Sequence, residues 1–146
     1  YFLDDGAYIV TRLLIALWRP VKMGYTLHSL IETLKEPAES MEFRMNIALE
    51  DFKPYGNSII EDLKTYAATR TGWSLEAANY EGVRVNLDKA HGDGWFLLRL
   101  SLHEPLMPLN IESDSVGGVK VIAAELVGFI AEYDKLDSSN LVEYSK

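Results

Sequence analysis

The sequence Gly94-Trp95-Phe96-Leu97-Leu98-Arg99-Leu100-Ser101-Leu102-His103-Glu104-Pro105 joins an apolar run to a polar turn. Residues 95–98 are typical of a buried strand, and the run 106–112 predicts a second strand directly after the turn. Because alternate side chains of an extended segment share a face, Arg99 and Ser101 are expected to point the same way. An arginine fork beside a hydroxyl and free backbone N–H groups suits a phosphate or a carboxylate.

These two residues also have a simpler interpretation. Arg99 can be a solvated arginine at a strand end and Ser101 an ordinary turn residue, since surface arginines are common. Residue type alone favours this simpler interpretation, whereas the residues around the turn favour the first.

Three stretches of the chain match, in order, the motifs of one enzyme family. Residues 94–112 resemble a pattern of glycine, apolar residues, R-x-S-[N/G]-T-E-P and an apolar strand ending in glutamate. Residues 82–85, Gly-Val-Arg-Val, resemble a "DGVRV" strand, and residues 4–8 resemble the "D-D-G-I-Y" start of a helix in the preceding domain. The chain therefore resembles the C-terminal part of an α-D-phosphohexomutase (phosphoglucomutase, phosphomannomutase or phosphoglucosamine mutase).

The resemblance implies that Arg99, Ser101, Leu102 and His103 form the loop that binds the substrate phosphate. Two of these residues depart from the family pattern: Leu102 stands where the family has Asn or Gly, and His103 where it has Thr. Asn or Gly often marks a positive φ, which leucine adopts at a cost, so a different loop backbone is expected. An imidazole would replace the threonine hydroxyl as a donor to phosphate.

The family moves phosphate between the C1 and C6 hydroxyls of a hexose, and the resemblance implies that this domain holds the non-reacting phosphate. The resemblance places the phosphoserine and the aspartates that hold Mg²⁺ in earlier domains, outside this chain. No catalytic residue, metal site or cofactor is therefore expected here, and the chain alone is expected to be inactive. The departures at Leu102 and His103 leave a second interpretation open, a non-catalytic sugar-phosphate-binding or regulatory relative.

Hydrophobic periodicity predicts two helices at the start of the chain. Asp4 or Asp5 is expected to cap the first, which Pro20 ends, and Thr26 the second, which ends before Pro37. The polar stretch 36–41 is the best candidate linker. The chain, which begins without methionine, is expected to be a piece of a longer polypeptide. Residues 1–37 would be the last helices of a truncated α/β domain, and residues 38–146 the C-terminal domain.

Within residues 38–146, alternating patterns predict strands over 43–49, 83–87, 95–101 and 107–112. Ser58 and Glu61 predict a capping box for a helix that ends near Gly72, and a last helix is expected up to residue 130. The tail after Asp137 is expected to fray. The predicted fold class is α+β: a four-stranded antiparallel sheet with two helices on one face, as the resemblance also implies.

Composition excludes several other classes of function. The net charge of −8 disfavours nucleic acid and anionic membranes as partners, and the absence of cysteine excludes disulfides and thiolate metal sites. The three histidines are widely separated, so no zinc site is expected, and His91 is expected to be exposed in a solvated turn. The partners that the resemblance implies are a hexose phosphate and the preceding domains of the same polypeptide. The expected location is the cytoplasm or the plastid stroma.

Overall fold

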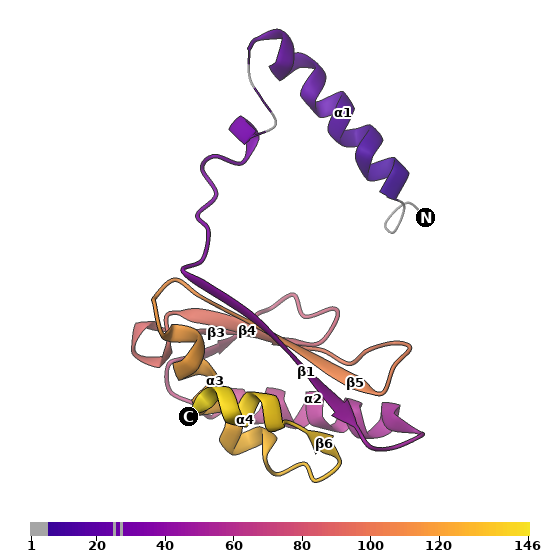
Figure 1. The fold of residues 1–146 in the computed structure, drawn as a ribbon, viewed down its shortest axis with the longest axis vertical. Coiled ribbons are helices and arrows are strands. Elements are labelled where there is room, and N and C mark those ends of the chain that lie inside the picture. The colour runs from indigo at the N-terminus through magenta and orange to yellow at the C-terminus, as the bar shows by residue number, and fades with distance from the viewer. Residues whose placement is uncertain (1–5, 25, 27) are drawn as a thin grey trace. The chain divides into compact units, whose positions relative to one another are not determined.

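The computed structural model describes residues 6–24, 26 and 28–146, and the chain separates into two compact units, Tyr1–Glu36 and Pro37–Lys146. The first unit contains α1 (Gly6–Lys22) and a 3₁₀ turn, η1 (His28–Leu30) (Figure 1). The caps predicted at Asp4 and Asp5 lie outside the described residues. The assignment of residues 1–37 to a preceding domain stays a prediction.

Both helices of the first unit differ from the prediction. The first does not end at Pro20 but continues to Lys22, although proline removes one backbone donor from its last turn. The second is only the single turn η1, which Thr26 caps by accepting from the N–H of Ser29 (3.3 Å). A short helix is marginal unless an apolar face is buried, and here the side chains of Ile31 and Leu34 are exposed.

The second unit is an antiparallel sheet covered by helices on one face. Its strands are β1 (Glu39–Ile47), β2 (Trp73–Leu75), β3 (Val83–Leu87), β4 (Gly94–Leu98), β5 (Leu106–Ser113) and β6 (Leu136–Asp137), in the order β2-β3-β4-β5-β1-β6. The helices α2 (Phe52–Ala68), α3 (Gly118–Ile130) and α4 (Ser139–Ser145) lie on the same side of this sheet (Figure 1). A 3₁₀ turn, η2 (Lys89–His91), connects β3 and β4.

The core lies between the sheet and the helices. Every second side chain is buried in β3, in β1 from Phe43 and in β4 from Phe96, and these side chains meet the buried stripes of α2 and α3. The remaining side chains of the strands, which include Arg44, Arg84 and Leu97, lie on the opposite face of the sheet. The α+β class is therefore confirmed.

The predicted count of four strands is wrong, because the sheet has six. The four predicted strands are its central strands β1, β3, β4 and β5, and the two additional strands β2 and β6 lie at the edges. β2 has three residues and β6 has two. Segments this short show no alternation, so only tertiary pairing reveals them.

The C-terminal tail is also not frayed. Residues Ser139–Ser145 form α4, in which Leu141 is fully buried. The ring of Tyr144 packs edge-on against Phe43 of β1, with 5.3 Å between ring centroids. The sheet therefore carries three helices on its covered face, where the sequence predicted two.

The helix α2 begins earlier than predicted, at Phe52, so Ser58 and Glu61 do not form a capping box. Its last residue, Ala68, precedes Gly72 by several positions, and Gly72 instead has a φ of 79° in the following turn. Gly56 lies inside the helix and is buried because Leu100 packs directly on it. A Cβ at Gly56 would lie 2.4 Å from Cδ1 of Leu100. This contact fixes the connection that leads from β4 to β5.

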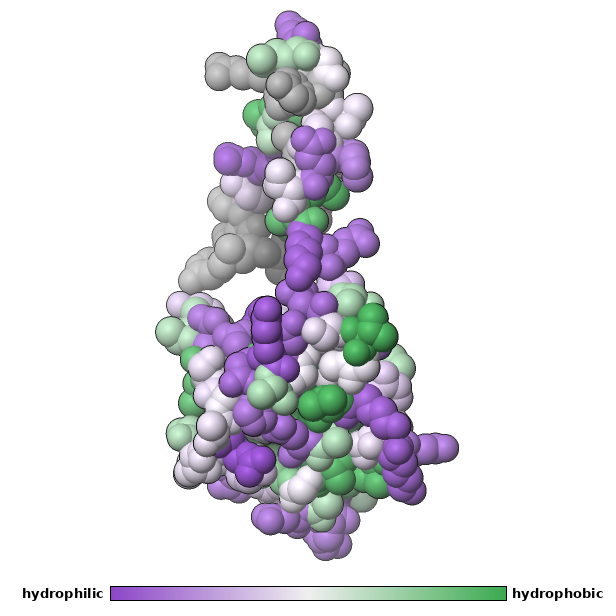
Figure 2. Space-filling model, turned by 90° about the vertical axis from the view of Figure 1, so that its left-hand side faces the viewer, coloured by the Kyte–Doolittle hydropathy of each residue, from purple (hydrophilic) through white to green (hydrophobic). Residues whose placement is uncertain are grey.

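The surface of the molecule is mixed in character. Figure 2 shows hydrophobic side chains scattered among hydrophilic ones over the face of the second unit that it presents. Throughout residues 6–24, 26 and 28–146, the helices are too short or too polar to cross a membrane.

Candidate functional site

The connection between β4 and β5, residues 99–105, continues the alternation of the strand that precedes it. The N–H of Arg99 donates to the carbonyl of Pro108 (3.1 Å), and the N–H of Ser101 donates to the carbonyl of Leu106 (3.0 Å). Leu100 points toward α2, where it packs on Gly56. Arg99 and Ser101 are therefore held on the face of the sheet that the helices do not cover; the sequence predicted that the two side chains point the same way.

A cleft of about 440 Å³ adjoins this connection. Its lining includes all four residues predicted to bind phosphate, and it also includes Arg44 and Tyr80; the full set is Arg44, Tyr80, Glu81, Arg99, Leu100, Ser101, Leu102, His103, Leu106 and Pro108. The guanidinium of Arg99 makes no hydrogen bond or ion pair with any described residue. Its charge is therefore available to an anion in the cleft.

Arg44 is a second cation of the cleft that the sequence analysis did not single out. It lies on β1 directly opposite Pro108, whose carbonyl accepts from Arg99, so the two arginines flank one residue of β5. Its ion pairs with Glu42 and Glu104 are long (3.5 Å each), and all three side chains are largely exposed. Such exposed pairs are weak and leave Arg44 able to change partner. Only the pairing of β1 with β5 brings it to the cleft, and no local sequence pattern indicates that pairing.

The hydroxyl of Ser101 organises the turn. Its oxygen accepts from the N–H groups of His103 (3.4 Å) and Glu104 (3.2 Å). These backbone donors therefore point at Ser101, whereas the sequence analysis expected them to be free for phosphate. The hydroxyl keeps its own hydrogen for donation into the cleft.

The two unusual residues of the loop lie beside the cleft. Leu102 is 75% exposed and does not have a positive φ; among the described non-glycine residues only Asp93 does. Leucine is therefore accommodated without the left-handed backbone that Asn or Gly would suggest. His103 is exposed, and its ring makes no hydrogen bond to the described residues, so the imidazole is available to a ligand. The phosphate-binding role of these residues stays a prediction.

Gly82 brings the segment before β3 directly against Arg99. It has a φ of 152°, and a Cβ there would lie 2.2 Å from the carbonyl oxygen of Leu98 and 2.9 Å from Cα of Arg99. Only glycine allows this approach. The residues just before it, Tyr80 and Glu81, are thereby placed on the rim of the cleft.

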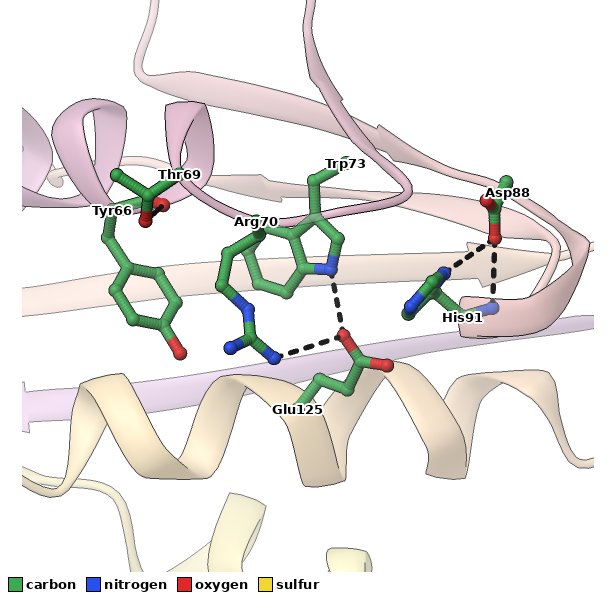
Figure 3. A network of polar contacts seen from close by, with 7 residues as sticks. All are labelled: Tyr66, Thr69, Arg70, Trp73, Asp88, His91 and Glu125. Carbon is green, nitrogen blue, oxygen red and sulfur yellow. Dashed lines mark hydrogen bonds and ion pairs between the residues drawn. The ribbon is translucent and has the colours of Figure 1, made fainter.

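A second polar cluster, away from the cleft, joins α2, β2 and α3 (Figure 3). The indole N–H of Trp73 donates to Glu125 (2.8 Å), and Arg70 lies 4.0 Å from the same carboxylate oxygen. His91, which was expected to be exposed in a solvated turn, is half-buried, and its Nδ1 lies 2.6 Å from Asp88. The contacts of this cluster are all internal to the fold, so we interpret it as structural.

The contact between Asp88 and His91 predicts a measurable titration shift. The hydrogen bond to Asp88 raises the pKa of His91 above 6.5, with Glu125 adding to the rise and Arg70 opposing it. The same hydrogen bond lowers the pKa of Asp88 below 3.8. The contribution of His91 to stability is complete below pH 6.5 and is lost as the pH rises through its raised pKa. The contribution of Asp88 to stability is present above pH 3.8 and is lost as the pH falls through its lowered pKa. The pair therefore stabilises the fold most between pH 3.8 and pH 6.5.

We expect Asp88→Asn to lower the pKa of His91 toward its ordinary value, because the charged partner is removed. The measurement is the chemical shift of the His91 ring protons across pH by NMR. Asp51→Asn, at a carboxylate that makes no capping bond, is the control and should leave the titration unchanged. An unaltered pKa in Asp88→Asn would contradict the assigned contact.

Metal ligands are not gathered in the described part of the chain. Across residues 6–24, 26 and 28–146, no group of three or more His, Cys, Asp or Glu side chains is arranged to hold a metal ion.

Comparison with known proteins supports the fold. No family model matches the sequence, and no curated protein sequence is similar to it. The structure is similar to the crystal structure of a phosphoglucomutase/phosphomannomutase family protein from Burkholderia thailandensis, with a TM-score of 0.55 and 23% identity. The similarity covers 88% of this chain and 24% of that protein, so the chain spans about a quarter of its length. The resemblance predicted from the motifs is thus confirmed at the level of the fold.

Proposed function

We propose that this chain is the phosphate-binding C-terminal part of a phosphohexomutase-like enzyme, an isomerase that moves phosphate between C1 and C6 of a hexose. One observation carries the proposal: Arg99, whose guanidinium has no partner among the described residues, lines a cleft together with Arg44, Ser101 and His103. Arginine binds phosphate through two parallel hydrogen bonds, and the serine hydroxyl adds a neutral donor. The fold shared with a protein of that family supports the same proposal.

The role of this site is to bind and orient. A net charge of −8 repels a phosphate in general, so a place where arginines converge is set apart from the rest of the surface. Binding of the non-reacting phosphate positions the hexose so that its other end can react with groups of the preceding domains. Such positioning makes the reaction effectively intramolecular. The phosphoserine and the Mg²⁺ that the family uses would come from the preceding domains, which are the proposed partners of this chain.

A second candidate function is a sugar-phosphate-binding or regulatory protein that does not catalyse. It is favoured by the loop itself, because Leu102 and His103 replace the family's residues and the backbone N–H groups are bound to Ser101. Both candidates use the same cleft for the same phosphate. They differ only in whether the polypeptide with its preceding domains turns the substrate over.

The test is a calorimetric titration of the purified chain with a hexose 6-phosphate, with inorganic phosphate and with the unphosphorylated hexose. We expect both phosphates to bind and the unphosphorylated sugar not to bind, because the cleft recognises the anion. A coupled mutase assay on the chain should show no turnover. Absence of phosphate binding would overturn the proposal. Turnover by the polypeptide that includes the preceding domains would favour the enzyme. Binding without turnover by that polypeptide would favour the regulatory relative.

A further inference from the structure

Tyr80 is an aromatic side chain that the fold leaves without a partner. It is 92% exposed, more than any other exposed large hydrophobic side chain in the described ranges. Within the same ranges its ring makes no aromatic contact and its hydroxyl no hydrogen bond. An aromatic ring contributes stability by burial or by contact with a ligand. Contacts within the fold give the ring of Tyr80 no such stabilisation. A bound ligand is the other source of contact for it.

The backbone that carries Tyr80 is held on both sides. Before it, the amide of Asn79 donates to the carbonyl of Glu76 (2.6 Å) and its oxygen accepts from the N–H of Arg84 (2.7 Å). After it, Gly82 packs against the backbone of Arg99. The ring is therefore exposed although its backbone is anchored. One of the two anchors is the end of β4, which carries Arg99.

Tyr80 and Leu102 both lie between two clefts. Both residues line the cleft that contains Arg99 and also a neighbouring cleft of about 370 Å³, which contains Lys53 and Lys64. The two clefts share Tyr80, Glu81, Leu100, Ser101 and Leu102. Two large, exposed apolar side chains thus border a site whose charged lining suits an anion. This is the composition of a site for a ligand with a charged end and an apolar face.

We propose that Tyr80, with Leu102, contacts the C–H face of the sugar ring whose phosphate is held at Arg99. The proposal rests on the function proposed above and deepens it, because it makes Tyr80 the residue that distinguishes a phosphorylated sugar from phosphate itself. The polar edge of the sugar ring would face the solvent and the polar lining of the two clefts, and its C–H face would displace water from the tyrosine ring. The ligand class is therefore a phosphorylated cyclic sugar.

The experiment compares two probes, a hexose 6-phosphate and inorganic phosphate, by titration of the whole chain. Tyr80→Ala should weaken binding of the hexose phosphate about fivefold and leave that of inorganic phosphate within about twofold. Tyr80→Phe retains the ring and should bind both as the wild type does. Val116→Ala is the matched control, because Val116 is an equally exposed apolar residue (89%) that lines neither cleft.

Each other outcome overturns the inference. If Tyr80→Ala binds the hexose phosphate as the wild type does, the ring contacts no sugar, although the phosphate site stands. If Tyr80→Ala weakens both probes equally, Tyr80 only supports the loop at Arg99. If Tyr80→Phe loses as much as Tyr80→Ala, the hydroxyl and not the ring is recognised. If the wild type binds neither probe, the proposed function fails and this inference fails with it.

Discussion

Replacing Arg99 with alanine is expected to weaken binding of a hexose phosphate by about 10- to 100-fold. A charge-assisted hydrogen bond contributes about 1.5–3 kcal/mol, and each tenfold change in affinity is about 1.4 kcal/mol. Because Arg99 has no partner within the described part of the chain, its removal leaves no buried group unsatisfied. Arg99→Ala should therefore weaken ligand binding without lowering the free energy of unfolding.

Arg99→Lys should recover little of this affinity. An ammonium group is a point charge and cannot form the two parallel bonds of a guanidinium. Lys120→Ala is the charge-matched control, since Lys120 is exposed on α3 and lines neither cleft. The measurement is the dissociation constant of each variant at fixed ionic strength. If Arg99→Ala binds as tightly as the wild type, the anion is not held at this loop.

Leu141→Ala is expected to lower the free energy of unfolding by about 2–5 kcal/mol, the usual cost of such a truncation in a packed core. Leu141 is fully buried and is the buried residue of α4. Urea unfolding followed by tryptophan fluorescence can measure this, because Trp73 lies in the same core. Its exposure to solvent reports loss of the sheet and its helices.

Glu143→Ala is the control for this prediction. It lies on the exposed side of the same helix and should change the unfolding free energy by less than about 0.5 kcal/mol. A frayed tail would give two neutral variants, because neither side chain would then be packed. Equal stability of Leu141→Ala and Glu143→Ala would therefore contradict the packing of α4 against the sheet.

The sequence could predict how Arg99 and Ser101 point because alternation along a strand is local information. Alternation along residues 95–101 was sufficient to place Arg99 and Ser101 on one face, and the structure brings both into the same cleft. The central strands were recognisable for the same reason. Leu102 has no positive φ, which agrees with the expectation that leucine avoids it, and the difference from the family's loop backbone stays a prediction.

The features that were missed depend on distant contacts. Arg44 joins the cleft only through the register of β1 against β5, and no local pattern in residues 39–47 contains that register. α4 has one buried residue, Leu141, so it shows no apolar stripe. The start of α2 was placed too late because Pro54 and Gly56 resemble a turn. Proline is tolerated in a first helical turn, and the glycine is explained only by the contact with Leu100.

The position of β1 in the sheet has a consequence for how this unit folds. β1 comes first along the unit, yet both of its neighbours, β5 and β6, come from the far end of the chain. Glu39 pairs with Ser113 and also accepts from the N–H groups of Gly117 and Val119 at the start of α3. These contacts are of long range in sequence, which is associated with slow folding. Until residues 106–137 have folded, both edges of β1 stay unpaired, so this strand is where mispairing between chains would begin.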